Sequence, residues 1–595
     1  MTPDQFIALK ASEAIKAIYG AEIEPSALQV GVTRKEFEGD YTLVVFPLLR
    51  MSRTTPENTG KAIGDWLVAN VPEISGFNCV KGFLNILFSN LYWNELFSEI
   101  VSTEDFGYLP STGKNVMVEF SSPNTNKPLH LGHIRNNLLG DSVSRLLKAS
   151  GNNVIKTTIV NDRGIHICKS MLAWQKVGKG ATPESTGRKG DHLVGDMYVA
   201  FNDIFKKEVE ELVAGGMDEE TAKKEAPCLK EAHEMLRKWE AGDKDVRDLW
   251  QRMNKWVLDG FDETYAALGI SFDKVYFESQ TYLLGKELVQ KGLDMGVFVR
   301  EADGSVWCDL TADGLDRKLL LRSDGTSVYI TQDLGTAERR FAEYSLDSHV
   351  YVVGDEQNYH FQVLKLILKK LGFSWADAIY HLSYGMVELP EGKMKSREGT
   401  VVDADDLIEK MYQEAKATSE ESGKLDDMSE EEKEKLFKMI GLGALKYFII
   451  KVDPKKTMLF NPKESIDFNG NTGPFIQYTH ARIRSILRKA SEKGVGYAEG
   501  TLPSVELSAK EIRLIKLLNL FPSKVAEGAA AYSPAVIANY AYDLAKEFNQ
   551  YYHETPILKE EDASMLQARL VLIDTLSAVL RRAMGILGIE LPERM

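Results

Sequence analysis

Cysteine is scarce in this sequence. The 595 residues include four cysteines, Cys79, Cys168, Cys228 and Cys308, and no two of them form a CxxC pair. Closely spaced cysteines are typical of disulfide-stabilised secreted domains and of zinc knuckles. The sparse pattern argues against both classes, so we expect a protein of a reducing compartment with no structural metal held by the chain.

Long hydrophobic runs are also missing. No stretch approaches the roughly 18 uninterrupted apolar residues that a membrane-spanning helix requires. The first residues, MTPDQFIALKASEAIKAIYG, mix acidic and basic side chains and lack the apolar centre of a secretory signal. These two observations predict a cytoplasmic protein that does not enter a membrane.

Positive charge is in deficit. The chain has 72 Lys and Arg against 87 Asp and Glu, a formal net charge of −15. A protein that coats DNA without sequence preference should be basic, so that role is disfavoured. Binding of a folded RNA through local patches stays open, because it depends on local rather than net charge.

The length predicts three or four domains, because single cores stop growing at about 250–300 residues. We expect a small α/β module over 1–112, a parallel-sheet α/β domain over 113–400, a connecting helical region over 401–459 and a helical bundle over 460–595. A charged, mostly helical insertion is expected within the second domain at about 175–300.

The second domain opens with an alternation of strand and helix patterns. The segments 115–120 (NVMVEF) and 153–160 (NVIKTTIV) are strand candidates. The segment 130–150 between them has apolar residues at helical spacing, namely Leu131, Ile134, Leu138, Val143 and Leu146. This order predicts a strand–helix–strand unit of a parallel sheet.

Two histidines, His130 and His133, lie three positions apart where this helix begins, in the stretch KPLHLGH. A zinc site would need a third ligand, and no HExxH motif or intervening acid accompanies the pair. Two hydrogen-bonded histidines at a helix start are a second interpretation. A phosphate site fits better, because free N–H groups at a helix N-terminus attract anions and Gly132 lets a ligand approach the backbone.

These motifs together resemble a known family. HLGH resembles the HIGH signature of class I aminoacyl-tRNA synthetases, and KMKSR at 393–397 resembles their KMSKS loop. The longer segments EFSSPNTNKPLHLGHIRNNLLGD, SVYITQDLG, VYVVGDEQNYHF, LSYGMV, NGNTGPFIQYTHARIRSILRKA and GIELPERM resemble the arginyl-tRNA synthetases in particular. The resemblance covers essentially the whole chain. It implies a Rossmann-type catalytic domain, an N-terminal module that contacts tRNA and an all-α C-terminal bundle that binds the anticodon.

The resemblance also implies an activity: ATP-dependent ligation of L-arginine to tRNA(Arg) through an arginyl-adenylate, with release of AMP and pyrophosphate. The implied partners are tRNA(Arg), L-arginine and ATP with Mg²⁺, and we expect a monomer. Neither chemical step needs a protein nucleophile. Positioning and neutralisation of phosphate charge would therefore provide most of the catalysis.

By resemblance, His130 and His133 contact the ATP phosphates and Lys393 stabilises the departing pyrophosphate. KMKSR departs from KMSKS because Ser396 replaces the second lysine. We expect Lys127 to take over that role, with Lys395 and Arg397 as rivals. The other residues expected to contact ATP are Gly132, Gly385, Met386, Val387, Lys395, Ser396 and Arg397. A solvated surface turn is the alternative for KMKSR taken alone.

The residues that match the family's arginine contacts suit a guanidinium, which is planar, always charged and bound by carboxylates. Tyr329 and Asp333 are four apart, hence on one face of a helix expected to begin there. The matching set is Glu119, Asn124, Tyr329, Asp333 and Gln357. The alternative for Asp333 is a surface carboxylate paired with Arg339 or Arg340.

The expected tRNA contacts rest on the resemblance and on aromatic side chains that can stack on unpaired bases. They are Phe83 and Asn85 in the N-terminal module, and Gln477, Tyr478, Arg482, Tyr551, Tyr552 and Met595 in the C-terminal bundle. We expect Tyr551 and Tyr552 to be exposed. Ordinary packing of a core strand and of a helical bundle is the alternative in each case.

Two other functions compete with ligation. A tRNA-binding paralogue without catalytic activity would be expected to lose His130, His133, Lys393 or the Tyr329 and Asp333 pair, and all are present. A different nucleotidyl transferase with an HxGH motif would be shorter and would need no helical C-terminal module. The sequence therefore favours an active synthetase.

Overall fold

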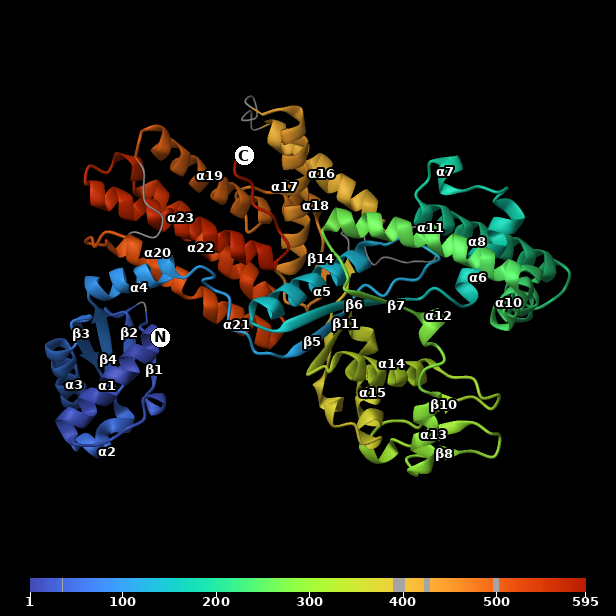
Figure 1. Ribbon diagram of the computed structural model, residues 1–595, viewed down its shortest axis with the longest axis horizontal. Coiled ribbons are helices and arrows are strands. Elements are labelled where there is room, and N and C mark those ends of the chain that lie inside the picture. The colour runs from blue at the N-terminus through green and yellow to red at the C-terminus, as the bar shows by residue number, and fades with distance from the viewer. Residues whose placement is uncertain (35, 389–401, 422–427, 496–501) are drawn as a thin grey trace. The chain divides into compact units, whose positions relative to one another are not determined.

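The computed structural model describes the chain except for residues 35, 389–401, 422–427 and 496–501 (Figure 1). Contacts between residues divide it into two units. Unit 1 comprises Met1–Phe106, Ile483–Phe521 and Lys546–Val579, and unit 2 comprises Gly107–Arg482, Pro522–Ala545 and Leu580–Met595.

Unit 1 begins with a four-stranded antiparallel sheet in the order β1-β2-β4-β3. Of the apolar residues of β4, Leu84, Ile86 and Phe88 alternate along the strand and are buried on one face of the sheet, while Asn85 between them is buried as well. The elements of this part are α1 (Pro3–Tyr19), η1 (Pro25–Ala27), β1 (Val30–Val32), β2 (Tyr41–Val44), η2 (Phe46–Leu48), α2 (Leu49–Ser52), α3 (Pro56–Asn70), β3 (Ile74–Val80), β4 (Phe83–Phe88) and α4 (Asn90–Ser102).

Side chains of α4 join this sheet module to the later part of unit 1. The Asn94 side-chain amide donates to the carbonyl of Val505 over 3.0 Å, and the backbone N–H of Leu507 donates to the Asn90 side-chain oxygen over 3.0 Å. Unit 1 therefore combines residues 1–106 with two segments near the C-terminus, whereas the predicted domains are continuous stretches of the chain.

All described elements after residue 472 are helices. They are α19 (Gly473–Glu492), α20 (Ala509–Asn519), α21 (Phe521–Ala531), α22 (Ala535–Glu554), η6 (Ile557–Lys559) and α23 (Ala563–Ile586). Among the described residues, α23 alone is long and apolar enough to cross a membrane, and half of its most apolar window is buried within the protein. A central helix of a helical domain has the same composition.

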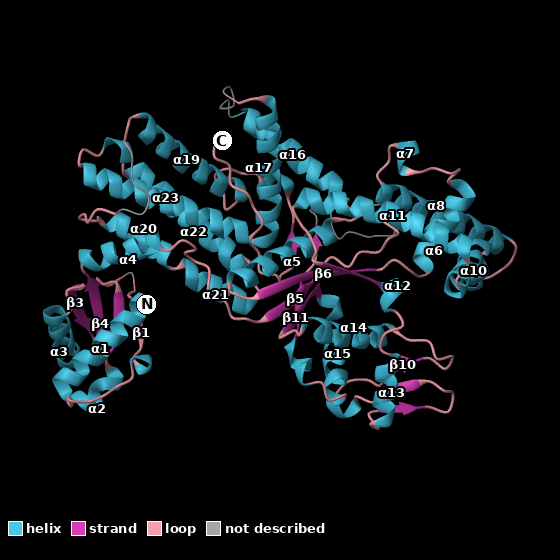
Figure 2. Cartoon of the chain, viewed as in Figure 1, coloured by secondary structure: helices cyan, strands magenta, loops and turns pink. Residues whose placement is uncertain are grey.

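Unit 2 is built on a five-stranded sheet in the order β12-β11-β5-β6-β7, with every neighbouring pair parallel. Figure 2 labels three of its strands, β5, β6 and β11. Its strands are β5 (Asn115–Glu119), β6 (Asn153–Val160), β7 (Lys274–Phe277), β11 (Ser348–Gly354) and β12 (Ile379–Tyr384). Helix α5 (Leu131–Ala149) connects β5 to β6, which confirms the predicted strand–helix–strand unit. The strand order reverses between β5 and β11, and ligands of such sheets bind at the carboxyl ends of the strands at this point.

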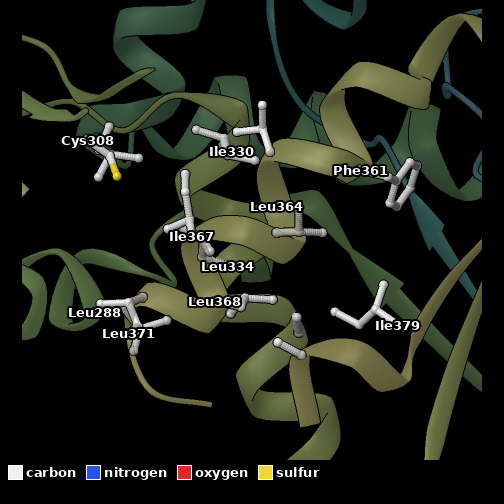
Figure 3. Packing of buried hydrophobic residues seen from close by; sticks show 14 of the residues in the cluster. Leu288, Cys308, Ile330, Leu334, Phe361, Leu364, Ile367, Leu368, Leu371 and Ile379 are labelled. Atoms are coloured by element: carbon white, nitrogen blue, oxygen red, sulfur yellow. The ribbon is translucent and has the colours of Figure 1, made fainter. Parts of the chain in front are cut away.

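Helices α14 (Tyr329–Tyr344) and α15 (Asn358–Lys370) pack together on one side of this sheet, where apolar side chains spaced at helical intervals interlock (Figure 3). Ile330 and Leu334 of α14 meet Leu364 and Ile367 of α15 in a buried cluster. This cluster extends to Ile379 of β12, so it fixes α14 against the sheet edge.

The chain between β6 and β11 holds most of the remaining elements. Those before α14 are α6 (Ile165–Val177), α7 (Pro183–Thr186), α8 (Gly190–Ala214), α9 (Glu219–Glu225), α10 (Pro227–Ala241), α11 (Lys244–Leu268), α12 (Glu278–Thr281), α13 (Lys286–Asp294), β8 (Phe298–Arg300), β9 (Val306–Cys308), η3 (Thr311–Asp313) and β10 (Lys318–Leu321). The predicted insertion at 175–300 thus contains a strand of the main sheet, β7. Strands β8–β10 form a separate three-stranded sheet.

The other elements of unit 2 follow β11 in the chain and precede α19. They are η4 (Asp355–Gln357), η5 (Ser374–Ala378), β13 (Val387–Glu388), α16 (Ala404–Glu421), α17 (Glu430–Ile450), β14 (Met458–Leu459) and α18 (Pro462–Ser465).

The C-terminal tail, defined as residues 588–595, is held by its main-chain carbonyls. The carbonyl of Gly588 accepts a hydrogen bond from the Lys446 ammonium over 2.6 Å, and that of Glu590 accepts one from the Gln477 amide over 2.9 Å. The carbonyl of Pro592 lies 2.9 Å from Nδ1 of His480, which must carry the proton because a carbonyl only accepts. The three side chains are buried in unit 2.

Candidate active site

The helix that follows the central strand begins with a capping box made of two histidines. His130 is the N-cap of α5, and its Nδ1 accepts the backbone N–H of Gly132 over 3.1 Å. Nδ1 of His133 accepts the backbone N–H of His130 over 3.2 Å. Because a backbone N–H can only donate, both Nδ1 atoms are unprotonated and each neutral ring carries its hydrogen on Nε2.

Both imidazoles are held in the neutral form. Burial lowers the pKa of His130 to about 4, with the Lys127 charge contributing. Burial also lowers the pKa of His133 well below its usual value, with His130 and Lys127 adding to the effect. The pKa of the Lys127 ammonium is itself lowered by burial. The site thus contains two Nε2–H donors and a partly desolvated cation at the positive end of a helix.

A second segment runs along this turn. The backbone N–H of Leu131 donates to the carbonyl of Val402, and that of Ala404 donates to the carbonyl of Leu129, each over 3.0 Å. His130 and Asp403 thereby form an antiparallel bridge. The predicted residues Lys393, Lys395, Ser396 and Arg397 lie outside the described residues, whereas the described segment 402–404 lies directly against His130.

The stretch Gly385–Val387 lies against a backbone segment that α5 also contacts. The N–H of Gly385 donates to the carbonyl of Pro454 over 3.0 Å, and a Cβ at Gly385 would lie 2.6 Å from the backbone carbon of Lys456. Arg135, buried on α5, donates to both of those carbonyls. Met386 is exposed, whereas Val387 is buried in β13. The close backbone approach therefore requires glycine at 385.

Asn136 of α5 joins the ends of two central strands. Its side-chain oxygen accepts the backbone N–H of Ser121, just after β5, and its amide donates to the carbonyl of Val352 in β11 over 2.8 Å. Ser121 and Ser122 both adopt positive φ, 76° and 47°, a conformation that non-glycine residues rarely adopt. This turn fixes the path of the loop that leads to Lys127. No sequence motif marks Ser121, Ser122 or Asn136 individually.

Tyr329 and Asp333 lie on the first turns of α14, which begins at Tyr329 as predicted. The Tyr329 side chain is 75% exposed, and an Asp333 carboxylate oxygen lies 2.6 Å from Nε2 of His360. The alternative that pairs Asp333 with Arg339 or Arg340 is wrong.

Arg340 instead forms a buried ion pair with Glu119 at the end of β5, and Arg339 pairs with Glu343. The Arg340 guanidinium also lies 4.5 Å from the ring centre of Tyr276. Burial raises the pKa of Glu119 although Arg340 opposes the shift. The negative charge of Glu119 is balanced by Arg340 inside the protein, so this carboxylate already has a cationic partner.

The remaining predicted arginine contacts are exposed at loop ends. Asn124 pairs with Asn161 beyond the ends of β5 and β6, and Gln357 precedes α15. Glu278, which the sequence analysis missed, begins α12 after β7. Its pKa is raised mainly by burial; the charge of Arg163 opposes this shift, and the charges of Asp162 and Asp333 add to it, so Glu278 shares with Asp333 an acidic region that also contains the Arg163 guanidinium. Strand β7, which precedes Glu278, has four residues and lies at the edge of the sheet, so the sequence shows no clear alternation of apolar and polar residues there.

The predicted tRNA contacts are of two kinds. Phe83 is 41% exposed and Tyr552 is 38% exposed, and the Arg482 guanidinium lies 4.9 Å from the Tyr478 ring centre. Met595 is half-buried. These side chains have surface available to a ligand.

The other three predicted tRNA contacts are buried. The expectation that Tyr551 is exposed is wrong: it is 2% exposed, and its hydroxyl donates to Glu511 over 3.0 Å. Asn85, 1% exposed, accepts from the Thr42 hydroxyl, and Gln477 donates to the carbonyls of Met439 and Glu590. In this structure they support neighbouring elements because buried polar atoms need partners.

Comparison with known proteins agrees with this geometry. Residues 98–461 match the family of class I (R) tRNA synthetase catalytic domains, and residues 476–595 match the DALR anticodon binding domain. The fold and the site are those of a class I aminoacyl-tRNA synthetase.

Individual relatives define the family more closely. The chain is 59% identical to the arginine–tRNA ligase of Bacteroides thetaiotaomicron and 56% identical to that of Porphyromonas gingivalis, with 98% of each chain covered in both cases. The structure of Thermus thermophilus arginyl-tRNA synthetase superposes with a TM-score of 0.78 at 26% identity, covering 100% of both chains. The chain belongs to the arginyl-tRNA synthetases, and its activity is the charging of tRNA with arginine.

Proposed function

We propose that the two Nε2–H groups of the histidine capping box bind the phosphates of ATP during the formation of arginyl-adenylate. The observation that carries this proposal is the pair of backbone hydrogen bonds that fixes both tautomers. Neutral donors at a helix N-terminus can stabilise added negative charge without giving up a proton. ATP enters with Mg²⁺, which supplies further neutralisation when bound.

Attack by the arginine carboxylate on the α-phosphate forms the acyl–phosphate bond and breaks the bond to pyrophosphate. His130 and His133 would orient the phosphates, and Lys127 would stabilise charge on the bridging and leaving oxygens. Lys393 would act on the pyrophosphate from the segment outside the described residues. The helix dipole adds to the same positive end, whereas the backbone N–H of Gly132 is already donated to Nδ1 of His130.

The acidic region beside α14 would select arginine. Asp333 would receive the guanidinium with Tyr329 beside it, and Glu278 supplies a further carboxylate nearby. Glu119 would act with Arg340 as a fixed ion pair rather than as a lone acid. Asn124 and Gln357, both exposed, would hold polar groups of the substrate.

The acceptor is tRNA(Arg), and the exposed Phe83 and Tyr552 together with the half-buried Tyr478 and Arg482 are the proposed base-stacking contacts. Met595 would add a contact from the C-terminal tail. We further propose that the protein is a monomer and acts in the cytoplasm. A sedimentation measurement tests the oligomeric state.

ATP–pyrophosphate exchange with each amino acid, with and without tRNA, tests the function. Arginine should support exchange far better than the other amino acids, and we expect exchange to require tRNA(Arg). Stronger exchange with another amino acid would overturn the assignment of the acidic region. Binding of tRNA without exchange or charging would instead indicate a catalytically inactive paralogue.

A further inference from the structure

A polar network connects the insertion helices to the segment that lies against the HLGH turn. Lys189, the residue before α8, places its ammonium 2.6 Å from Oδ2 of Asp405 and 3.3 Å from Oδ2 of Asp191. Its third partner is the hydroxyl of Thr264 on α11, at 2.6 Å. His192 of α8 places Nε2 3.0 Å from the same Asp405 oxygen.

This network is an ion-pair cluster rather than an available metal site. Asp191, His192 and Asp405 lie close enough to hold a metal ion together. However, the Lys189 ammonium has three oxygen partners there, the number that its three hydrogens can serve. Its positive charge lies where a cation would bind.

The two ends of the network differ in burial. Asp191 is fully buried, and a Cβ on Gly260 of α11 would lie 2.4 Å from its carboxylate oxygen, so α8 and α11 are packed tightly around it. Asp405 lies on the first turn of α16, and its backbone N–H donates to the side chain of Asp403 over 2.8 Å. A well-packed helix pair therefore holds the segment 402–405 through Asp405.

That segment is the one that fixes the nucleotide-binding turn. Val402 and Ala404 hydrogen-bond to Leu131 and Leu129 on either side of His130. The backbone N–H of His130 in turn donates to His133. A shift of residues 402–405 would thus move the N-cap and both imidazoles.

We propose that Lys189 and His192 are positioning residues for the nucleotide site, acting through Asp405 on the His130 turn. This inference rests on the proposed function, in which His130 and His133 bind the ATP phosphates. Lys189 and His192 do not touch ATP themselves. They keep the phosphate donors in place from the insertion, more than 50 residues away along the chain.

Partial loss of this network should weaken the binding of ATP more than the binding of arginine. A displacement of catalytic groups by about 1 Å can cost about 100-fold in rate, so a partial loss of the network is expected to raise KM for ATP by about 10-fold. KM for arginine should stay within about twofold of wild type, because α14 and its core cluster make no contact with this network in the interactions described above.

The test compares Lys189→Met, Lys189→Arg and Lys207→Met in tRNA-dependent exchange and in calorimetric titration with ATP. Lys207 is the matched control, because it lies on the same helix α8 and is an exposed lysine paired with Glu211. We expect Lys189→Met to weaken ATP binding selectively, Lys189→Arg to restore much of it, and Lys207→Met to resemble wild type.

Equal losses for ATP and arginine in Lys189→Met, or no loss in a folded variant, would overturn the inference. If Lys189→Met does not fold, as judged by circular dichroism, His192→Gln and Asp405→Asn decide by the same ratio of KM values. Normal ATP titration by wild type with no arginine-dependent exchange would contradict the proposed function instead. The calorimetric comparison of variants would still test the positioning role.

Discussion

Nδ1 of His133 lies 3.2 Å from the backbone nitrogen of His130 and accepts its hydrogen. The residues most favoured at helix N-caps, such as Ser, Asp and Asn, would satisfy the backbone equally well. Asp would place negative charge toward a phosphate, and a small cap would not extend a donor beyond the helix end. A histidine here accepts a backbone N–H of the first helical turn with Nδ1 and leaves its Nε2–H as a donor for a phosphate.

Replacement of His130 by Asn should separate these two roles. Asn can accept the N–H of Gly132, so we expect the thermal midpoint to stay close to wild type. Adenylate formation should fall by about 10²–10³, the usual cost of one lost donor to a developing charge. Single-turnover formation of arginyl-adenylate measures this, and His130→Ala should lose both stability and rate. An unaffected rate in His130→Asn would exclude Nε2 as the phosphate donor.

The depressed pKa of His130 has a consequence for stability. The unfolded chain takes up a proton near pH 6.5, whereas the folded ring does so only near about pH 4. Stability from this group is therefore complete above pH 6.5 and is lost as pH falls from 6.5 toward 4, by about 1.4 kcal/mol per pH unit at most. Denaturant unfolding at pH 7.5 and 5 should show a smaller difference in His130→Asn than in wild type. Equal differences would mean that His130 is not held neutral.

Lys127→Ala should slow adenylate formation while leaving tRNA affinity near wild type. The ammonium is close enough to lower the pKa of both histidines, so it would act on the same phosphates. Pre-steady-state exchange and filter binding of tRNA provide the two measurements, and Lys114→Ala, at an exposed position, is the control. An unchanged rate would move the role to Lys395 or Arg397.

Asp333→Asn should weaken arginine binding far more than ATP binding. Loss of a charge-assisted pair to the guanidinium is worth about 1.5–3 kcal/mol, or roughly 10- to 100-fold in KM for arginine. His360→Gln serves as a comparison, because it removes the neighbour of Asp333 while retaining the carboxylate. Similar losses for both substrates in Asp333→Asn would count against the guanidinium role.

Arg340→Met should destabilise unit 2, because it leaves Glu119 buried without its partner. Removal of one member of a buried ion pair typically costs about 3–5 kcal/mol. The double variant Arg340→Met with Glu119→Gln should recover much of this loss, since no lone charge then remains. Urea unfolding followed by tryptophan fluorescence tests the difference. A double variant no more stable than the single one would show that packing, rather than charge, dominates.

The central part of the catalytic fold could be predicted because its pattern is local. Strand β5 and helix α5 bury consecutive and helically spaced apolar residues, respectively, and each period is visible within 20 residues. The start of α14 at Tyr329 was likewise marked by sequence. Strand β7, in contrast, is a four-residue edge strand with exposed Val275, and its pattern is too short to distinguish from the surrounding helices.

The candidate site was predictable where a motif fixes the backbone and not where partners are distant. The position of His130 and His133 followed from the helix start. The partner of Glu119 lies 221 positions later, at Arg340, so no local pattern could show that this acid is already paired. The sequence alone suggests that the polar residues Gln477 and Tyr551 lie at the surface. Both can be buried because oxygen atoms of residues distant in sequence, Glu590 and Glu511, accept their hydrogens.

The attachment of the C-terminal tail bears on how the protein can be handled. Proteolytic trimming from residue 588 onward would leave the buried donors of Lys446, Gln477 and His480 without those carbonyl oxygens, at about 1–3 kcal/mol for each unsatisfied group. An affinity tag is therefore better placed before Met1 than after Met595, where its cleavage site would invite such trimming.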